Sequence, residues 1–293
     1  MPALIVLMIE SGTAGLGFES IVELAKHKPS QIFFTGRNSE RAEKIVEDFE
    51  KQRPDVPVTF LECDLAFFAS VITAADQFLS LSSRLDILIC NAGIMAKPPG
   101  LTTDGYELQF GTNHMGHALL IQKLLPTLLN TADAGADVRV VILTSLGFRG
   151  HPKGGIDFPS LKTTRNGFIG HWVRYAHSKL ANLLYARELA RRHPNITCVS
   201  VHPGVVKTGL VSDLRLADKL LVYITNMGRM MNPGEGAWNQ LWAATGNKAD
   251  IQNGQFYEPV GVLSNNLTRT SQDDDLAARL YDWTDSELKP FMI

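Results

Sequence analysis

The chain has 293 residues, of which 45% are hydrophobic and 20% are charged, and its formal net charge is −2. This length and composition fit one large globular domain, because α/β domains reach about 250 residues as one unit. The near-neutral charge argues against a protein that binds nucleic acid or an anionic membrane, since such proteins usually carry a basic patch.

The three cysteines, Cys63, Cys90 and Cys198, lie in or beside apolar segments at wide spacing. Because this spacing matches neither a disulfide framework nor a metal site, we expect buried free thiols and assign no metal. Free thiols suit a reducing compartment, so we expect a cytoplasmic protein. The apolar residues 2–9 are too few to span a bilayer and run directly into a glycine loop, which predicts a first strand and neither a signal peptide nor a membrane span.

Short apolar segments alternate with longer amphipathic ones along the chain. Strands are expected at 3–9, 31–35, 57–61, 86–90, 137–144 and 196–201, with a weaker one at 255–258, and helices at 15–26, 39–52, 67–82, 105–131, 172–192 and 233–245. This alternation predicts a parallel sheet, and the nearly continuous apolar strands indicate burial on both faces. The expected fold is a single-domain α/β Rossmann fold, a doubly wound sheet of about seven strands with helices on both faces.

A glycine loop, residues 10–17, joins the first expected strand to the first expected helix. Glycines let the backbone approach a pyrophosphate closely, and a helix N-terminus offers free N–H groups and partial positive charge. The alternative is a simple tight turn, but the position of the loop at the head of a βαβ unit favours a dinucleotide site. The candidate cofactor contacts in this loop are Gly12, Thr13, Gly15, Leu16 and Gly17.

The end of the second expected strand favours NADP over NAD. An acidic residue near this position would hold the ribose 2′-OH of NAD, whereas arginine accommodates the 2′-phosphate of NADP. Here Gly36 is followed by Arg37 and Asn38, and no acid is present. A surface arginine that caps the next helix is the alternative. We expect Arg37 and Asn38 to contact the cofactor.

Tyr175 and Lys179 are four residues apart, so they share one face of an expected helix. Tyrosine normally ionises near pH ~10, and a nearby ammonium should lower that value, so that Tyr175 can give or take a proton. The pair alone would also fit an ordinary amphipathic helix. Ser145 shifts the balance, because it ends a buried strand, where its hydroxyl can hold a substrate oxygen; by itself it could be a helix cap.

The chain resembles the short-chain dehydrogenase/reductase family over nearly its whole length. The resemblance rests on the glycine loop, Cys63-Asp64-Leu65, Asn91-Ala92-Gly93, Asn113, Ser145, Tyr175-Ala-His-Ser-Lys179 and His202-Pro-Gly-Val-Val-Lys-Thr208, in that order. The local sequences around Asn113, Tyr175 and His202 look like the retinol-dehydrogenase-like reductases. Residues 234–246 look similar to reductases of fungal secondary metabolism.

The resemblance implies roles for residues that the spacing alone leaves open. The catalytic set would be Asn113, Ser145, Tyr175 and Lys179, with Asn113 linking the lysine to solvent through water; the alternative is a buried asparagine that bonds the backbone. The implied cofactor contacts outside the glycine loop are Arg37, Asn38, Asp64, Leu65, Asn91, Ala92, Gly93, Tyr175, Lys179, Pro203, Gly204, Val206 and Thr208. For Asn91–Gly93 and Pro203–Thr208 the alternative is a simple turn. His114 and His117 are expected to be structural, not metal ligands.

The glycine loop departs from the pattern Thr-Gly-x-x-x-Gly-x-Gly. Glu10 replaces the threonine and Ser11 the first glycine, with Gly12 one place late. A serine that needs a positive φ is strained, and a carboxylate repels a pyrophosphate unless it is turned away or paired. The main expectation is an NADP(H)-dependent oxidoreductase that interconverts a hydrophobic ketone or aldehyde and its alcohol. The altered loop leaves two alternatives open, an isomerase or cyclase of the same fold and a non-catalytic NADP(H)-binding protein.

Within the single domain 1–293 we expect a cofactor half at about 1–145 and a catalytic and substrate half at about 146–293. Two long irregular regions, 147–167 and 204–232, follow strand ends, and the second is a candidate substrate lid. Candidate apolar lining residues are Leu214, Leu220, Tyr223, Met227, Met230, Met231, Phe148, Phe158, Phe168 and Trp172. They suggest a bulky apolar substrate. The family is often dimeric through two long helices, so a homodimer is a candidate assembly, although the insertion 147–171 could alter that contact.

Overall fold

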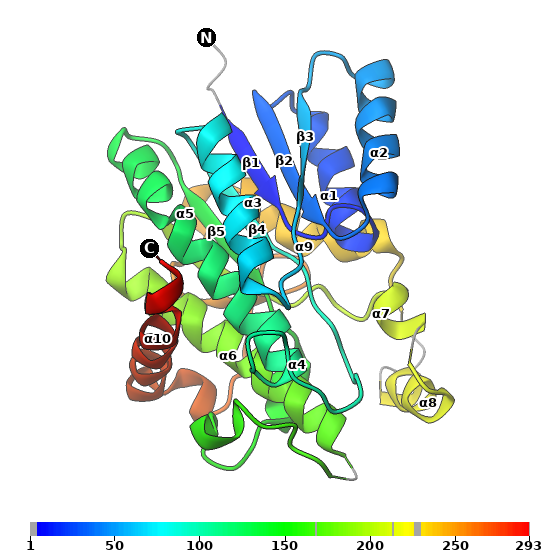
Figure 1. The fold of residues 1–293 in the computed structure, drawn as a ribbon, viewed down its shortest axis with the longest axis vertical. Coiled ribbons are helices and arrows are strands. Elements are labelled where there is room, and N and C mark those ends of the chain that lie inside the picture. The colour runs from blue at the N-terminus through cyan, green and yellow to red at the C-terminus, as the bar shows by residue number, and fades with distance from the viewer. Residues whose placement is uncertain (1–4, 168, 213, 226–229, 293) are drawn as a thin grey trace.

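One eight-stranded sheet with helices on both faces organises the computed structural model, which describes residues 5–167, 169–212, 214–225 and 230–292 (Figure 1). The strand order is β3-β2-β1-β4-β5-β6-β7-β8, and every pairing is parallel except that of β7 with β8. The strands are β1 (Val6–Ile9), β2 (Gln31–Gly36), β3 (Val58–Glu62), β4 (Ile87–Cys90), β5 (Arg139–Leu143), β6 (Thr197–Val201), β7 (Phe256–Glu258) and β8 (Val262–Leu263). The predicted doubly wound α/β fold is confirmed, with a two-residue eighth strand that the sequence analysis missed.

The helices cover the two faces of the sheet in two sets. The longer helices are α1 (Gly15–Ala25), α2 (Ser39–Gln52), α3 (Phe68–Leu81), α5 (Gly116–Asp133), α6 (Gly170–Arg192), α8 (Leu216–Thr225), α9 (Pro233–Thr245) and α10 (Asp274–Leu288), and the two short ones are α4 (Leu108–Phe110) and α7 (Gly209–Ser212). Apolar residues of α3, α5, α6 and α10 form the core on one face, and those of α1, α2 and α9 form it on the other. Successive side chains of β1 point to opposite faces of the sheet, so Met8 packs in the first core and Ile9 in the second.

Two helical regions differ from the sequence expectation. The helix predicted at 105–131 is divided into α4, one π-helical turn at Gly111–Met115 and α5. Helix α10 was not predicted, although Asp273 caps it by accepting a hydrogen bond from the Leu276 N–H at 2.9 Å. Of the first predicted strand, residues 3–4 lie outside the described part of the chain. The aromatic ring of Tyr281 on α10 stacks on Tyr185 of α6, with ring centroids 5.0 Å apart, and this contact holds α10 on the core.

The sheet has a topological switch point between β1 and β4. The chain runs outward from β1 through β2 to β3 and then returns to pair β4 with the other edge of β1. In open α/β sheets, a crevice for ligands forms where the carboxyl ends of such strands diverge.

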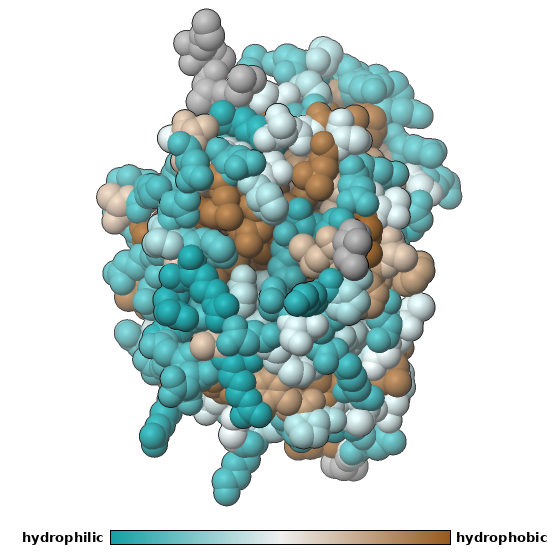
Figure 2. Space-filling view, turned by 60° about the vertical axis from the view of Figure 1, so that its left-hand side comes forward, coloured by the Kyte–Doolittle hydropathy of each residue, from teal (hydrophilic) through white to brown (hydrophobic). Residues whose placement is uncertain are grey.

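The molecular surface on the face shown in Figure 2 is mainly hydrophilic and has a few separate hydrophobic patches. No helix of the described residues is long and apolar enough to cross a membrane.

Candidate active site

The glycine loop forms the turn between β1 and α1. Gly15 has a φ of +56°, in the left-handed region that glycine adopts without strain, whereas Ser11 adopts the same region with a φ of +53°. The expected strain at Ser11 is therefore present. A Cβ atom on Gly17 would lie 2.4 Å from the Ser11 carbonyl oxygen, so only glycine allows this turn to close. Helix α1 then begins with no side chain capping its first N–H groups, which leaves them available to an anion.

Two of the predicted loop contacts lie behind the loop instead of on its open side. Gly12 is buried against β2 and α1, since a Cβ atom there would come within 2.7 Å of both Ile21 and Phe34. Thr13 packs on Gly36 of β2, where a Cβ would lie 2.9 Å from the threonine methyl. Neither Gly12 nor Thr13 lines the cavity described below, and their contact with the cofactor stays a prediction. They shape the loop by letting it pack on neighbouring elements.

The carboxylate of Glu10 is turned away from the loop. Its side chain is completely buried, and Oε2 lies 3.0 Å from Nε2 of His117 on α5. Because the carboxylate is both averted and paired, the electrostatic objection to a pyrophosphate in this loop does not apply. The backbone of Glu10 still continues the sheet, as its N–H donates to the Ile89 carbonyl at 3.0 Å.

A large cavity of about 680 Å³ opens at the carboxyl ends of β1, β4, β5 and β6. Its walls include most of the predicted site: Gly15, Leu16, Arg37, Asn91, Ala92, Gly93, Ser145, Tyr175, Lys179, Pro203, Gly204, Val206 and Thr208. Ser11, Ala14, Thr144 and His202 also line it and were not predicted. The first two belong to the predicted glycine loop, where the glycines alone were singled out.

The remaining predicted cofactor residues do not line this cavity. Gly17 is buried beneath the loop, and Asn38 caps α2 by accepting a hydrogen bond from the Arg41 N–H at 2.8 Å. Asp64 accepts a hydrogen bond from the Ala66 N–H at 3.0 Å, and Leu65 is buried against α5. The structure thus gives Gly17, Asn38 and Leu65 local structural roles. Contacts of Asn38, Asp64 and Leu65 with the far end of a dinucleotide stay predictions.

Tyr175, Lys179 and Ser145 converge on one wall of the cavity. Tyr175 and Lys179 lie on α6, with Nζ 6.0 Å from the centroid of the tyrosine ring, and both side chains are almost fully buried. Nζ donates a hydrogen bond to the Leu143 carbonyl at 3.0 Å, which holds the ammonium against the end of β5. Ser145 follows β5, and its Oγ accepts a hydrogen bond from the Gly147 N–H at 3.1 Å.

Burial controls the protonation of this pair. It raises the pKa of Tyr175 to about 12, although a hydrogen bond with Ser145 acts in the opposite direction. Burial also lowers the pKa of Lys179 to about 8, while the negative charge of Glu10 partly opposes that change. The net shift of the tyrosine pKa is therefore opposite to the expected lowering, because burial penalises the charged phenolate.

Asn113 holds together the segments behind the cavity and is itself fully buried. Its Oδ1 accepts a hydrogen bond from the Ile94 N–H at 2.7 Å, and its Nδ2 donates to the Ile94 carbonyl and to Ser178 Oγ, each at 2.9 Å. It therefore makes the backbone contacts that were the alternative to its relay role. Asn113 also lies in the π-helical turn, a feature often found at functional sites.

The space between these walls fits a nicotinamide dinucleotide. The loop offers uncapped helix N–H groups, and the exposed Arg37 at the end of β2 has no carboxylate partner among the described residues. Two buried atoms on lining residues, Asn91 Oδ1 and His202 Nδ1, have no hydrogen-bond partner in the described part of the chain. Such atoms can be satisfied by a polar ligand that enters the cavity.

Comparisons with known proteins identify the family. A family model described as short chain dehydrogenase matches residues 5–168, more than half of the chain. The chain belongs to the short-chain dehydrogenase/reductase family. It is 35% identical over 286 residues to an uncharacterized oxidoreductase of Schizosaccharomyces pombe, and the match covers 95% of this chain and 83% of that protein. It is 31% identical over 282 residues to retinol dehydrogenase 11 of Homo sapiens, with 94% and 83% covered.

A solved structure agrees with this assignment. The crystal structure of an uncharacterized protein from Mycobacterium paratuberculosis superposes with a TM-score of 0.74 at 29% identity and covers 98% of this chain and 94% of that one. The predicted family and its retinol-dehydrogenase-like and fungal resemblance are confirmed. As a short-chain dehydrogenase/reductase, the protein is an oxidoreductase that acts on small carbonyl or alcohol substrates with a nicotinamide cofactor.

In this short-chain dehydrogenase/reductase, apolar side chains pack around Tyr175. Met95, Tyr175 and Leu214 form a small buried cluster, and Trp172 packs against it. The indole Nε1 of Trp172 donates to Asp218 Oδ1 of α8 at 2.9 Å, so α8 is tied to the start of α6. Met95 was not predicted, because it lies in an irregular segment with no periodic signal.

The predicted lid residues are divided among different places. Leu220, Tyr223 and Met230 line a second cavity beside α8, which shares Thr208, Gly209 and Val211 with the first. Met231 packs on Gly204, where a Cβ would lie 2.5 Å from its sulfur. Met227 and Phe168 lie outside the described residues.

Two of the aromatic lining predictions are wrong. Phe148 is fully buried in the core that includes α6, and its ring packs edge-on against Phe256 at a centroid distance of 5.9 Å. Phe158 packs against Trp283 of α10. Neither aromatic side chain lines the cavity that holds Tyr175. The irregular segment turns both rings toward the core, since burial of a large apolar ring is favourable.

Proposed function

We propose that this protein is an NADP(H)-dependent reductase of hydrophobic ketones or aldehydes, with the reverse oxidation available to the same site. The observation that carries the proposal is the meeting of Ser145, Tyr175 and Lys179 in a cavity that Met95, Leu146 and Trp172 also line. The glycine loop and Arg37 lie in the same cavity. A dinucleotide and a substrate carbonyl can therefore be held together there.

Tyr175 acts as the proton donor in the proposed reduction. With a pKa of about 12, its phenol is protonated at neutral pH and can give its proton to the substrate oxygen. Ser145 lines the same wall and holds that oxygen by a hydrogen bond. The reduced nicotinamide supplies the hydride when it is bound. The reverse oxidation requires Tyr175 to lose its proton, which its raised pKa opposes.

Lys179 and Asn113 support this proton transfer. The Lys179 ammonium, fixed to the Leu143 carbonyl, places positive charge beside the phenol and stabilises the phenolate that forms as the proton leaves. Asn113 fixes the backbone at Ile94, directly after Asn91–Gly93, and so keeps the cofactor side of the cavity in place. Its proposed link between Lys179 and solvent is an additional role for this residue.

The NADP preference rests on Arg37. Its exposed guanidinium lies at the end of β2, where it can grip a 2′-phosphate through two parallel hydrogen bonds. The proposed cofactor wall comprises Gly15, Leu16, Arg37, Asn91, Ala92, Gly93, Pro203, Gly204, Val206 and Thr208. The segments 1–145 and 146–293 then serve as cofactor and substrate halves, and 204–232 as a lid.

Titration of the purified protein with NADPH and NADH, followed by nicotinamide fluorescence, tests the cofactor. We expect tight binding of NADPH and weak binding of NADH; absence of binding by either would contradict the proposal. The mechanism is tested with Tyr175→Phe and a series of apolar ketones and aldehydes. This variant should bind NADPH normally and lose turnover. Tyr185→Phe is the matched control, because Tyr185 lies on the same helix and is buried away from the cavity. It should retain turnover, and normal turnover in Tyr175→Phe would refute the assignment.

A further inference from the structure

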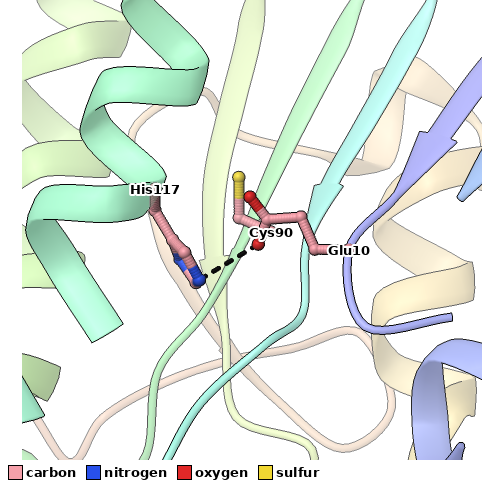
Figure 3. Close-up of side chains that lie close together, drawn as sticks. All are labelled: Glu10, Cys90 and His117. Carbon is pink, nitrogen blue, oxygen red and sulfur yellow. Dashed lines mark ion pairs between the residues drawn. The ribbon is translucent and has the colours of Figure 1, made fainter. Parts of the chain in front are cut away.

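A compact cluster of three chemically different side chains lies behind the cofactor loop. It consists of Glu10 after β1, Cys90 at the end of β4 and His117 on α5, with exposed fractions of 0%, 0% and 2%. The three side chains gather in one place, with a carboxylate oxygen of Glu10 directed at the His117 ring and the Cys90 thiol beside the carboxylate (Figure 3). One ligand-type atom from each residue lies within 4.8 Å of those of the other two, and Glu10 Oε2 and His117 Nε2 are 3.0 Å apart.

The polar atoms of this cluster are not satisfied by hydrogen bonds. Both carboxylate oxygens of Glu10 and both ring nitrogens of His117 lack a hydrogen-bond partner within the described chain. The approach of Oε2 to Nε2 is close, but it does not have hydrogen-bond geometry. Leaving a buried polar group unpaired costs about 1–3 kcal/mol, and a buried charge costs more. Glu10 Oε1 and His117 Nδ1 have neither a hydrogen bond nor an ion-pair partner among the described residues, and a bound cation would satisfy the lone pairs of both residues.

We propose that Glu10, Cys90 and His117 form a buried binding site for a zinc-class divalent cation. Carboxylate, thiolate and imidazole are the three side-chain ligand types that zinc accepts, whereas calcium and magnesium prefer oxygen ligands alone. A zinc ion with one carboxylate, one thiolate and a neutral imidazole has zero net charge, which suits a site without solvent. Neither oxygen of Glu10 accepts a hydrogen bond of good geometry among the described residues, so a bidentate carboxylate can complete four donor atoms.

The site would connect the three segments that shape the cofactor cavity. Glu10 leads directly into the glycine loop, Cys90 directly precedes Asn91–Gly93, and His117 lies one helical turn after Asn113. An ion shared by these residues would fix β1, β4 and α5 relative to one another. Because its ligands come from distant parts of the sequence, binding would also stabilise the folded state. The cation has a structural role in this proposal and takes no part in proton transfer.

The first test measures metal in the complete protein, produced in zinc- or cobalt-supplemented medium and purified without chelators. We expect about one metal ion per chain by mass spectrometric elemental analysis. The cobalt form should show a sulfur-to-cobalt charge-transfer band in the near ultraviolet. Cys90→Ala and His117→Phe should lose the metal. Cys198→Ala should keep it, because Cys198 is a buried thiol on the same sheet that lies outside the cluster.

A second variant keeps the proposal testable if Cys90→Ala or His117→Phe fails to fold. The chain has three cysteines, so the double variant C63A/C198A leaves Cys90 as the sole thiol. Retention of the cobalt band in that variant identifies Cys90 as the ligand. The proposal is overturned by protein that holds no stoichiometric zinc or cobalt, even after refolding with either ion. Metal content that is unchanged in folded Cys90→Ala and His117→Phe, or a missing sulfur band in folded C63A/C198A, would overturn it too.

Discussion

Replacing Lys179 by methionine should make the protein more stable at neutral pH while it abolishes activity. Burial lowers the pKa of the lysine from its ordinary value of 10.5 to about 8. Each pKa unit corresponds to 1.36 kcal/mol, so keeping this side chain charged in the folded state costs about 3 kcal/mol. Methionine fills much of the same space without a charge. It loses one hydrogen bond to the Leu143 carbonyl, worth about 1 kcal/mol.

The Leu143 carbonyl still accepts one hydrogen bond in the Lys179→Met variant. Asn182 Nδ2 also donates to the Leu143 carbonyl, at 3.0 Å. The net expectation for Lys179→Met is therefore a gain of about 2 kcal/mol in the free energy of unfolding at pH 7. Activity should be lost in the same protein, because no ammonium remains beside Tyr175. Stability and function are expected to oppose each other at this one position.

The gain in the free energy of unfolding of Lys179→Met should decrease as the pH rises. The folded lysine has the lower pKa, so between pH 8 and 10.5 the unfolded chain binds more protons than the folded one. The stability of the parent protein therefore rises relative to the variant across that window. At pH 10 only about 1 kcal/mol of the charge penalty remains, and the two proteins should be nearly equal in stability.

Urea denaturation of both proteins at pH 7 and pH 10, followed by circular dichroism, measures this difference. The other titrating groups are common to both proteins and largely cancel in the comparison. A variant that is less stable than the parent protein at pH 7 would contradict the expected penalty for the buried charge. A stability difference that is the same at both pH values would refute it equally, because the gain would then not come from the charge.

Four further outcomes can be checked. Arg37→Ala should weaken NADPH binding about 10- to 100-fold, as expected for a lost charge-assisted contact, and leave NADH binding unchanged; equal loss for both would remove the 2′-phosphate role. Gly17→Ala should destabilise the fold by about 1–3 kcal/mol in urea denaturation, since its Cβ would lie 2.4 Å from the Ser11 oxygen, and a neutral result would mean that the loop adapts freely. Asp218→Ala, which frees Trp172 from α8, should raise KM for bulky ketones without changing the Kd of NADPH; a change confined to NADPH affinity would argue against the lid. Reduction should slow as the pH rises above about 8, when Lys179 loses its charge, whereas a profile flat to pH 10 would show that the charge is dispensable.

The sequence predicted those parts of the site that depend on local spacing. The four-residue separation of Tyr175 and Lys179 places them on one helix face in any helical structure. Gly15 and Gly17 likewise mark a turn that needs no tertiary information. The direction of the tyrosine pKa was missed, because burial depends on the whole fold and spacing does not report it. Phe148 was misplaced for a related reason, since an irregular segment has no period from which to read its inner face.

Helix α10 shows a different limit of sequence reading. Its cap and its apolar spacing from Leu276 to Leu288 were both present, but the acidic first turn and the mixed polarity obscured the pattern. The π-helical turn at Asn113 has no propensity signal, because it is one residue wider than a helix that would otherwise be regular. Such turns become visible only when the side-chain contacts of the folded protein are known, here those between Asn113 and Ile94.

The departure of the glycine loop from the family pattern is explained by the period of β1. Successive side chains of a strand point to opposite faces, so residue 10 follows Met8 toward α5, and Ile9 points to the other core. The Glu10 side chain therefore reaches His117 and not the open side of the loop. A substitution at this position changes the packing behind the loop while the backbone groups that face the cavity keep their places. Ser11 is different, because its strain lies in the backbone of the loop itself.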